Sequence, residues 1–518
     1  MRKNFPPSPI IGIDDMSVYV PKIYLPIETL AESRNIEFGK LHNGLGLEGM
    51  ALADVHEDTA TMAANAIHDL ITKNHIDPKK IGRIYLGTES ALDDAKPTAT
   101  YILEMLTQTF SNEFGEDCFL NCDVVDMIFA CIGGVDALQN TIDWVSGETD
   151  RIAIVVTSDN AKYEMGSTGE YTQGAGAVAM LITHQPRILA IHNIWGVATQ
   201  PVHDFFKPKR EAQKKDLFDE VLKLANISGV DVGSLLDQID STIEVNGLLD
   251  SNETKVSFYK PTPVFNGPHS NKCYQERILE AFKNYSHNAS KKGMGPNGKT
   301  LTETWERIIF HLPYAYQGRR MFAEIFYLEL INAGKWSVVE VETGIHPPIR
   351  NDYESEDSYQ RAYGHFLRLL GKSAAYKRFV SEKIEKGERA SSKVGNMYTG
   401  SIFLSLMSTL SADLQEGEEM EGKSIGFFAY GSGSKSKVFE GVVMSGWANR
   451  VREFSLFEKL AKRQAIDYAT YELLHRGKLK ESIQYVSSEF KLVSNEDAIG
   501  LPGERHYEWK TNIPHPAR

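Results

Sequence analysis

The pattern of hydrophobic and polar residues predicts an α/β arrangement in the first part of the chain. Short apolar runs rich in β-branched residues predict strands at 10–22, 81–87, 151–157 and 177–182. Apolar residues spaced three or four apart predict helices at 27–33, 58–74 and 97–106, and one more through Val135, Leu138, Ile142 and Val145. The continuous apolar run 151–157 is typical of a parallel strand that is buried on both faces.

The later part of the chain repeats this alternation with charged segments between the elements. A strand is predicted at 305–311, a helix through Phe403 to Leu410, and a hairpin of 424–430 and 437–443 with a glycine-rich tip at 431–434. Segments 209–260 and 334–390 are charge-rich and are predicted to be insertions on the core. Residues 450–518 are predicted to form a mixture of helix and irregular chain.

Composition narrows the classes of protein that the chain can belong to. The 518 residues fit two or three domains, or one large fold of two fused halves. No apolar run approaches the roughly 18 residues that span a bilayer, and residues 1–7 lack the apolar core of a signal peptide. A net charge of −13 argues against nucleic acid as the main partner. Four cysteines in so long a chain form no disulfide framework, which favours a cytoplasmic protein.

Cys131 is the first candidate for chemistry, because it lies where a strand-like run meets a helix. The free N–H groups at a helix N-terminus favour a thiolate, which is the nucleophilic form. A buried structural cysteine is the alternative, and this stretch alone favours it, since free cysteines are commonly buried. Cys118 and Cys122 are interpreted as packing residues, and no metal site is predicted, because neither CxxC pairs nor histidines at ligand spacing accompany them.

Further candidates lie at other ends of strands and starts of helices. Glu89 follows the strand 81–87, His311 ends the strand 305–311, and Asn396 precedes a helix. Each residue alone has an ordinary interpretation as a loop carboxylate, a structural histidine or a helix cap. Together with Cys131 and the glycine-rich tip, they are typical of covalent acyl transfer with carbanion chemistry.

The order of these motifs resembles the 3-hydroxy-3-methylglutaryl-CoA (HMG-CoA) synthase family of the thiolase-like superfamily. The resemblance covers most of residues 10–445 apart from the two insertions. It rests on residues 12–21, 88–96, 130–131, 158–163, 172–180, 203–208, 263–267, 311–314, 395–400 and 430–434.

The resemblance implies an α/β, thiolase-like five-layered αβαβα fold of two fused similar halves. Residues 1–186 would form the N-terminal half with Glu89 and Cys131. Residues 187–518 would form the C-terminal half with His311 and Asn396, carrying insertions at about 209–260 and 334–390. The family is homodimeric and acts in the mevalonate pathway of isoprenoid biosynthesis.

The resemblance also implies a reaction: acetyl-CoA and an acetoacetyl thioester condense to an HMG thioester through acetyl-Cys131. No cofactor is expected, since acetyl-CoA and acetoacetyl-CoA are substrates. The implied roles are nucleophile for Cys131, general base for Glu89, which later assists hydrolysis, and an imidazole near the 3-oxo group for His311, placed to donate a proton to the alkoxide. Asn396 would hold the acetoacetyl group, and the backbone N–H of Ser432 would join that of Cys131 in an oxyanion hole. The polar positions implied to line the site are Asp159, Tyr163, Thr172 and Asp204.

Two positions depart from the family's pattern. Ile132 follows the cysteine where an aromatic residue is usual, and Tyr316 replaces a lysine thought to meet the CoA phosphate, with Arg319 and Arg320 following it. These departures leave open an acceptor on an acyl carrier protein, as in polyketide β-branching, with the basic segment from Lys207 to Lys215 as a rim for the acidic carrier. A ketoacyl-synthase III-like enzyme and a non-catalytic thiolase-like scaffold are further alternatives.

Overall fold

The computed structural model describes residues 10–240, 254–294, 299–493 and 503–511. The chain divides into two compact units: Met1–Asp204 with Asn266–Arg518, and Phe205–Phe265. The prediction made on residues 1–7 lies outside the described residues, as do parts of the insertion 209–260 and of the C-terminal segment. Within the described residues, no helix is long and apolar enough to cross a membrane.

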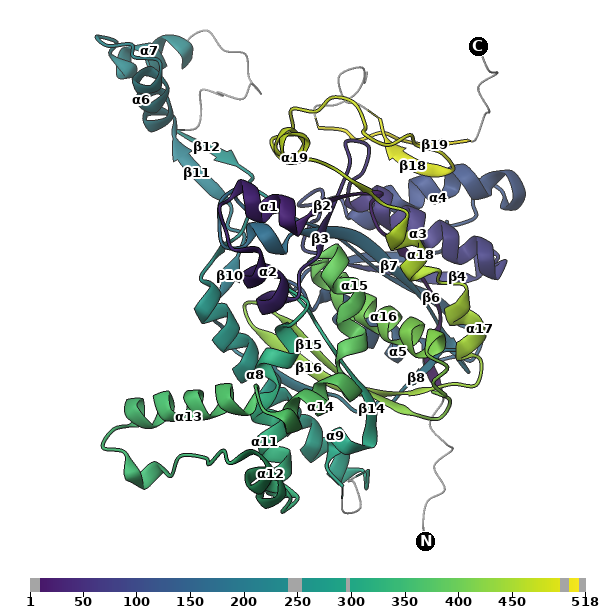
Figure 1. The fold of residues 1–518 in the computed structure, drawn as a ribbon. Helices are drawn as coiled ribbons and strands as arrows, with labels where there is room; N and C mark the ends of the chain where they lie inside the picture. Colours follow the sequence, from purple (N-terminus) through teal and green to yellow (C-terminus); the bar gives the residue numbers. More distant parts are fainter. Residues whose placement is uncertain (1–9, 241–253, 295–298, 494–502, 512–518) are drawn as a thin grey trace. The chain divides into compact units, whose positions relative to one another are not determined.

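A 10-stranded mixed sheet runs through the larger unit (Figure 1). β4 is parallel to both β5 and β6, and β14 is parallel to β15, while the remaining neighbours pair antiparallel. Its path is β14 (Trp305–Phe310), β15 (Ser424–Gly431), β16 (Lys435–Val443), β8 (Leu189–Ile191), β1 (Ile11–Tyr19), β7 (Gly174–His184), β6 (Ile152–Ala161), β4 (Ile81–Gly87) and β5 (Asp123–Met127), with β9 (Gly196–Thr199) beside β16.

The two faces of the N-terminal part of the sheet are buried against different helices. Ile154 and Leu181 pack in one core cluster, whereas their neighbours Val155 and Met180 pack in another. Because side chains alternate along a strand, both faces must be covered by apolar helices. The first face packs against α3 (Thr59–Asn74) and α4 (Thr98–Phe114), and the second against α5 (Gly133–Val145).

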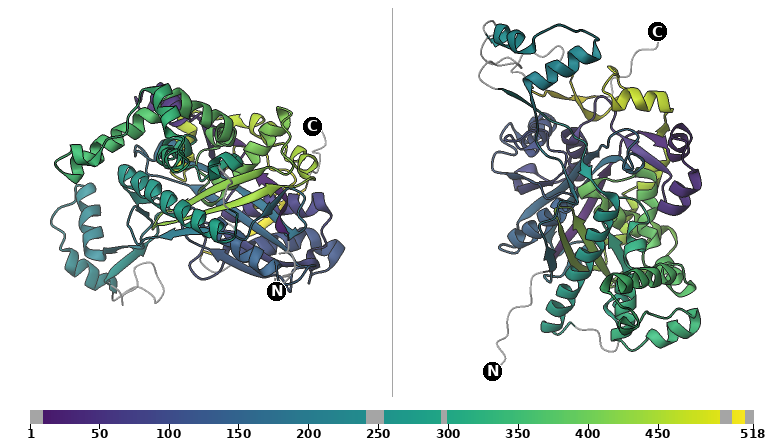
Figure 2. Two further views of the ribbon diagram at one scale, coloured as in Figure 1. Left: turned by 90° about the horizontal axis from the view of Figure 1, so that it is seen from below. Right: turned by 90° about the vertical axis from the view of Figure 1, so that its left-hand side faces the viewer.

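The C-terminal part of the sheet repeats this arrangement. Phe427 packs in the same central cluster as α5, together with α16 (Ser401–Gln415), while Phe428 packs on the opposite face with α8 (Gly267–Lys291). Figure 2 shows α8 lying along the strands β15 and β16. The order of layers is therefore α3 and α4, sheet, α5 and α16, sheet, α8. This order confirms the predicted five-layered αβαβα fold.

Shorter elements complete the larger unit. β2 pairs with β3 and with β17, and these strands pack with α1 and α2 in a separate small core. The charge-rich segment 334–390 is largely helical. These elements are β2 (Ile23–Pro26), β3 (Gly49–Leu52), β17 (Gln464–Ala465), α1 (Ile27–Ser33), α2 (Phe38–Leu45), η1 (Pro78–Lys80), η2 (Glu170–Thr172), α9 (Leu301–Thr304), α10 (Gln317–Met321), α11 (Ala323–Asn332), α12 (Trp336–Thr343), η3 (Arg350–Asp352), α13 (Glu356–Leu370), α14 (Ala374–Lys383), α15 (Glu385–Val394), η4 (Tyr398–Gly400), α17 (Trp447–Arg452), α18 (Leu456–Ala461) and α19 (Tyr468–His475).

The smaller unit consists of two short strand pairs and two helices. β10 pairs with β13 and β11 pairs with β12, both antiparallel. Of the basic residues in this unit, Lys214 is buried at the start of α6. The elements are β10 (Phe205–Phe206), β11 (Arg210–Gln213), α6 (Lys214–Leu224), α7 (Val232–Asp240), β12 (Lys255–Phe258) and β13 (Val264–Phe265).

The C-terminal segment binds to the N-terminal half through two short strands. These strands are too short to be predicted from a hydrophobic pattern. β18 (Glu489–Leu492) pairs with β19 (Tyr507–Lys510). The Phe490 N–H donates to Asn65 Oδ1 at 2.8 Å, and the Leu492 N–H donates to the carbonyl of His56 at 2.9 Å. These bonds join the last described strands to His56, which precedes α3, and to Asn65 within α3.

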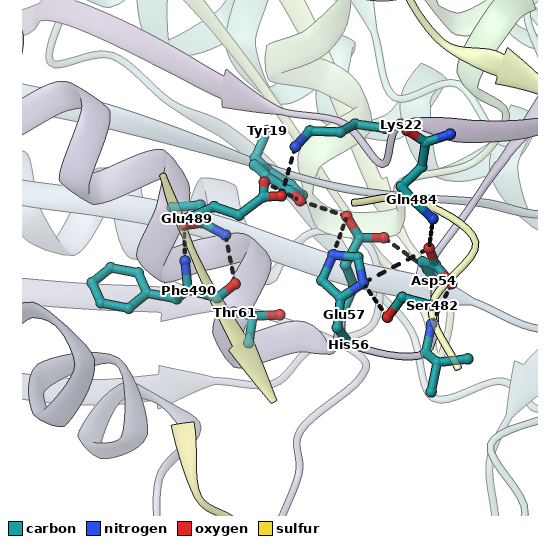
Figure 3. Close-up of polar contacts among 12 residues, drawn as sticks. Tyr19, Lys22, Asp54, His56, Glu57, Thr61, Ser482, Gln484, Glu489 and Phe490 are labelled. Carbon is teal, nitrogen blue, oxygen red and sulfur yellow. Dashed lines mark hydrogen bonds and ion pairs between the residues drawn. The ribbon is translucent and has the colours of Figure 1, made fainter. Parts of the chain in front are cut away.

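A cluster of acidic side chains lies under this attachment (Figure 3). We call Tyr19, Lys22, Asp54, Glu57 and Glu489 the carboxyl cluster. The Tyr19 hydroxyl lies 2.5 Å from Glu57 Oε1 and 3.1 Å from Glu489 Oε2, and Lys22 Nζ lies 2.6 Å from Glu489 Oε1. The Asp54 N–H donates to Glu57 Oε2 at 2.7 Å. Burial raises the pKa of Glu57 to about 7, so that its neutral form is favoured in the folded protein.

Asp54 connects the cluster to the chain that precedes β18. Its two carboxylate oxygens accept the N–H groups of Ile483 and Gln484 at 3.1 and 2.9 Å. Beside it, His56 Nδ1 lies 2.9 Å from the Ser482 hydroxyl, as Figure 3 shows. The carboxyl cluster therefore fixes residues 482–489 through both side chains and backbone.

Candidate active site

Cys131 and Glu89 are in direct contact. The Cys131 thiol donates to Glu89 Oε1, with Sγ 2.7 Å from the oxygen. Cys131 lies between the end of β5 at Met127 and the start of α5 at Gly133, and it is 8% exposed. It therefore lies just before the first turn of a helix, where the sequence analysis expected it. A thiol and a carboxylate that are 42 residues apart in the sequence therefore lie within hydrogen-bonding distance.

Asp159 holds Glu89 through the backbone. Asp159 Oδ1 accepts the Glu89 N–H at 2.7 Å and lies 3.1 Å from the hydroxyl of Thr88. β6 extends beyond the predicted 151–157 to Ala161, so Asp159 is a strand residue, and it is fully buried. Glu89 itself is half-buried. Asp159 therefore positions the backbone of Glu89, and the Glu89 side chain is directed at the thiol.

Thr399 joins the two halves at this point. Its N–H donates to Asp159 Oδ2 at 3.0 Å, and its hydroxyl oxygen lies 2.5 Å from the same Oδ2 and 2.9 Å from the carbonyl of Gly87. Thr399 belongs to η4, directly before α16. A residue from the C-terminal half thus contacts both Asp159, which accepts the Glu89 N–H, and Gly87, the last residue of β4.

Two buried phenols face the same charges. The pKa of Tyr163 is raised by burial and then by the negative charges of Cys131 and Glu89. Burial, Tyr163 and the same two charges raise the pKa of Tyr398. Both phenols therefore stay protonated at neutral pH and can act only as neutral hydrogen-bonding groups. Their rings lie 6.5 Å apart.

Thr172 and Asn396 meet through the backbone. The Asn396 N–H donates to the carbonyl of Thr172 at 2.9 Å, and Asn396 Oδ1 accepts the Tyr398 N–H at 2.8 Å. Tyr398 adopts a positive φ of 40°. The motif 395–400 therefore forms a turn that contains Asn396, Tyr398 and Thr399.

His311 lies at the end of β14, fully enclosed by protein. Its ring Nδ1 is 2.7 Å from the hydroxyl oxygen of Ser401, the first residue of α16. The His311 N–H donates to the carbonyl of Phe428, and the His311 carbonyl accepts the hydroxyl of Tyr274 at 2.8 Å. Burial lowers the pKa of His311 to about 3, so the ring is neutral at physiological pH.

The glycine-rich turn after β15 packs directly on the Cys131 segment. A side chain at Gly431 would place its Cβ 2.8 Å from the Phe129 carbonyl oxygen and 2.9 Å from the Ile132 nitrogen. Only glycine permits this approach. Asp204 is fully buried and holds the turn, since its carboxylate accepts the Tyr430 hydroxyl at 2.5 Å and the Gly433 N–H at 2.8 Å. Ser432 therefore lies in a turn in which Gly431 packs on the Cys131 segment and Gly433 is held by Asp204.

The predicted site residues divide into two groups. Cys131, Glu89 and Tyr163 share one electrostatic environment, and Ser432 and Asn396 lie in turns connected to it. Asp159 and Asp204, predicted to line the site, are buried and bind backbone N–H groups. The pattern did not single out Tyr398, Thr399 or Ser401, although they belong to or directly follow the motif 395–400; Ser and Thr before a helix otherwise indicate only caps.

The two departures from the family's pattern have local explanations. Ile132 is fully buried in the central core, with its side chain against Gly431. Tyr316 packs against Gly46, and the guanidinium of Arg319 lies over its ring. Arg319 is ion-paired with Glu388. Arg319 is thus committed to a carboxylate of its own chain.

Comparison with protein families agrees with this geometry. Residues 7–186 match the family model described as hydroxymethylglutaryl-coenzyme A synthase N terminal. Residues 252–499 match the model described as hydroxymethylglutaryl-coenzyme A synthase C terminal. The chain belongs to the hydroxymethylglutaryl-CoA synthase family.

Curated relatives cover nearly the whole chain. The chain is 29% identical to the hydroxymethylglutaryl-CoA synthase of Haloferax volcanii, over 96% of this chain and 99% of the relative. It is 30% identical to the hydroxymethylglutaryl coenzyme A synthase of a Fusarium species, over 89% and 88% of the two chains. The enzyme from Enterococcus faecalis is 27% identical, over 93% and 96%.

Solved structures show the same fold. MvaS in complex with 3-hydroxy-3-methylglutaryl coenzyme A superimposes with a TM-score of 0.72 at 25% identity, over 97% of this chain and 99% of MvaS. The curacin-pathway HMG synthase, solved in complex with an acetyl donor-ACP, superimposes with a TM-score of 0.67 at 19% identity, over 96% and 100%. The thiolase-like fold of the family is therefore that of this chain.

Proposed function

We propose that this chain, an acyltransferase of the hydroxymethylglutaryl-CoA synthase family, condenses acetyl-CoA with an acetoacetyl thioester to give an HMG thioester. The observation that carries the proposal is the contact between the Cys131 thiol and Glu89 Oε1. Asp159 and Thr399 hold the backbone around Glu89 from both halves of the fold. A scaffold without catalysis has no need for a base fixed at a thiol, so this geometry supports an enzyme.

The first step is acetylation of Cys131. Glu89 takes the thiol proton, the sulfur attacks the acetyl carbonyl, and the carbon–sulfur bond to CoA breaks. The departing CoA thiolate then takes the proton from Glu89, which restores the carboxylate. The backbone N–H groups of Cys131 and Ser432 are proposed to stabilise the oxyanion that forms at the carbonyl. The close approach of the glycine-rich turn to residues 129–132 supports this pairing.

The second step forms the carbon–carbon bond. Glu89 removes a proton from the acetyl methyl, and the carbanion attacks the 3-oxo carbon of the acetoacetyl group. The alkoxide produced takes this proton back from Glu89. Water then attacks the Cys131 thioester, with Glu89 as its base, and the HMG thioester leaves while the thiol is restored. A base within reach of the thioester is required for each proton movement.

His311 and Asn396 are proposed to hold the acceptor. Burial lowers the pKa of His311 and so favours a neutral ring, which is proposed to donate a neutral N–H bond to the 3-oxo oxygen. This role differs from the one expected from the sequence, in which His311 donates a proton to the alkoxide. Asn396 lies one backbone turn away from Thr399 and is proposed to bind the acetoacetyl group.

The proposal is tested by mass spectrometry and a condensation assay. We expect an acetyl adduct on the intact protein after mixing with acetyl-CoA, and its loss in Cys131→Ala. Cys122→Ala removes another half-buried thiol and serves as the matched control, which should retain the adduct. A Cys131→Ala protein that condenses the substrates at the normal rate would refute the proposal, and an absent adduct in the native protein would favour the scaffold.

The carrier of the acceptor is resolved by the same assay. We propose acetoacetyl-CoA as the acceptor, and acetoacetyl-acyl carrier protein is offered in parallel as the alternative. Condensation with the carrier protein alone would replace our assignment. The homodimeric state and the cytoplasmic location remain proposals that rest on family resemblance and on four free thiols. Sedimentation analysis tests the dimer.

A further inference from the structure

The His311 ring and the Leu312 N–H both contact the hydroxyl oxygen of Ser401. Ser401 Oγ accepts the N–H of Leu312 at 2.8 Å and lies 2.7 Å from Nδ1 of His311. Ser401 is fully buried, and His311 is 1% exposed. The backbone bonds of His311 to Phe428 and Tyr274 fix the position from which the ring extends.

Counting protons at this oxygen decides the direction of the bond to the ring. The Leu312 N–H is always a donor, so Ser401 Oγ must accept there. The serine hydroxyl then has one proton of its own to place. Among the described residues, His311 Nδ1 is the acceptor within reach of that proton. If Nδ1 instead carried a hydrogen, two donors would point at Oγ and a buried hydroxyl proton would have no acceptor, which is unfavourable.

We infer that Ser401 is a positioning residue that fixes His311 as the tautomer with its ring proton on Nε2. Within the described part of the chain, no protein group forms a hydrogen bond with Nε2, so this N–H is left for a ligand. The inference rests on the proposed function for the identity of that ligand, the 3-oxo oxygen of the acceptor. The depressed pKa of the ring agrees with a neutral donor.

Because of this arrangement, Ser401 should affect the condensation step and not the acetylation step. Acetylation of Cys131 uses the thiol, Glu89 and the oxyanion hole, whereas the side-chain hydrogen bonds of Ser401 among the described residues are to His311 and Leu312. Condensation uses the acceptor ketone, which needs a donor at Nε2. Loss of the Ser401 hydroxyl should therefore slow condensation and leave acetylation unchanged.

The native protein provides the first test. In a protein labelled with ¹⁵N-histidine, the His311 resonances are assigned as those lost in His311→Gln. We expect a neutral ring at pH 7 with its proton on Nε2 and a bare Nδ1. A ring protonated on Nδ1, or an imidazolium at pH 7, would overturn the inference, and this measurement does not depend on the folding of any Ser401 variant.

Variants provide the second test. Ser401→Ala should reduce condensation about tenfold, the equivalent of one hydrogen bond, leave the rate of acetyl-adduct formation unchanged, and populate both ring tautomers. Ser401→Thr keeps the hydroxyl and should restore the Nε2 tautomer. Ser411→Ala is the matched control on the same helix, because its buried hydroxyl makes no hydrogen bond among the described residues. Unchanged condensation in Ser401→Ala would overturn the inference.

The outcomes separate this inference from the proposed function. If the native protein forms no acetyl adduct, the proposed function fails whichever tautomer is seen. If the adduct forms and His311 is protonated on Nδ1, the proposed function stands and the role of Ser401 fails.

Discussion

Glu89 and Glu57 are both acidic residues of the N-terminal half that lie beside a proton donor, yet their surroundings differ. Glu89 is held through its backbone N–H by Asp159, and its side chain meets the Cys131 thiol. Glu57 is buried, and its two carboxylate oxygens meet the Tyr19 hydroxyl and the Asp54 N–H. Glu89 is thus held through its backbone N–H with Oε1 at the thiol, whereas both carboxylate oxygens of Glu57 bind groups of the surrounding fold.

The same difference appears in what each region connects. The Glu89 site brings together the ends of β4 and β6 and the start of α16, which belong to different halves of the fold. The carboxyl cluster connects β1 and the residues before α3 to the C-terminal segment. Both regions depend on distant parts of the chain, but in the first one a half-buried carboxylate meets a thiol. Four predictions follow from this difference, in order of decreasing effect.

The largest contrast should come from the same substitution at both residues. Glu89→Gln removes the base and should reduce kcat by about 10²–10⁴. Glu57→Gln reproduces the neutral carboxyl that burial favours, because its amide can donate to the Tyr19 oxygen and accept from Asp54. Steady-state condensation assays should find its kcat unchanged. Equal losses in the two variants would show that the regions are not functionally distinct.

Removing the contact between the two halves should have a smaller effect on activity. Thr399→Val keeps the size of the side chain but deletes the hydroxyl that meets Asp159 and Gly87. We expect kcat to fall about tenfold to a hundredfold, since Glu89 is no longer firmly placed. Thr409→Val is the control: its hydroxyl bonds only within α16, to the carbonyl of Ser405. A Thr399 variant with the control's activity would contradict the positioning argument.

The carboxyl cluster should respond in stability rather than in activity. Tyr19→Phe deletes the hydroxyl between Glu57 and Glu489 and leaves the two carboxyl groups facing each other. The free energy of unfolding in urea should fall by about 1–3 kcal/mol, with kcat retained in the folded protein. A loss of activity at full stability would instead connect this cluster to catalysis.

The smallest effect should be a pH dependence of the C-terminal attachment. The pKa of Glu57 is raised from 4.5 to about 7 in the folded protein, so its neutral form stabilises the fold below pH 4.5 and this contribution is lost as the pH rises through about 7. The groups around it are Tyr19, Asp54, Lys22 and Glu489, with His56 beside them.

Hydrogen exchange of residues 482–493 measures this loss directly. The free energy of local opening should decrease by about 1 kcal/mol between about pH 6 and pH 8. Glu57→Gln has no such titration, so its opening free energy should stay constant over this range. A native protein with the same flat profile would show that Glu57 does not titrate there.

The α/β class and most core elements could be predicted from the sequence. Periodicity predicted β1, β4, α3, α5, β14 and the β15–β16 hairpin close to their observed bounds, because their burial is regular on one or both faces. α4 and β6 extend further than predicted for different reasons. Residues 107–114 of α4 are half-buried or exposed and show no clear apolar period, whereas the residues added to β6 are mostly buried although Ser158, Asp159 and Asn160 are polar. β18 and β19 have too few residues for alternation to be distinguished from chance.

The sequence by itself determined which residue types are present at the ends of the strands and their order, and therefore the family and the chemistry of a thiol with a carboxylate. Only the tertiary structure decided that Asp159 and Asp204 are fully buried and accept the backbone N–H groups of Glu89 and Gly433, and that Thr399 and Ser401 contact Asp159 and His311. A hydroxyl before a helix has the same local pattern whether it caps that helix or bonds to a side chain 90 residues away, as Ser401 does. Such roles depend on contacts between distant segments, which no local pattern specifies.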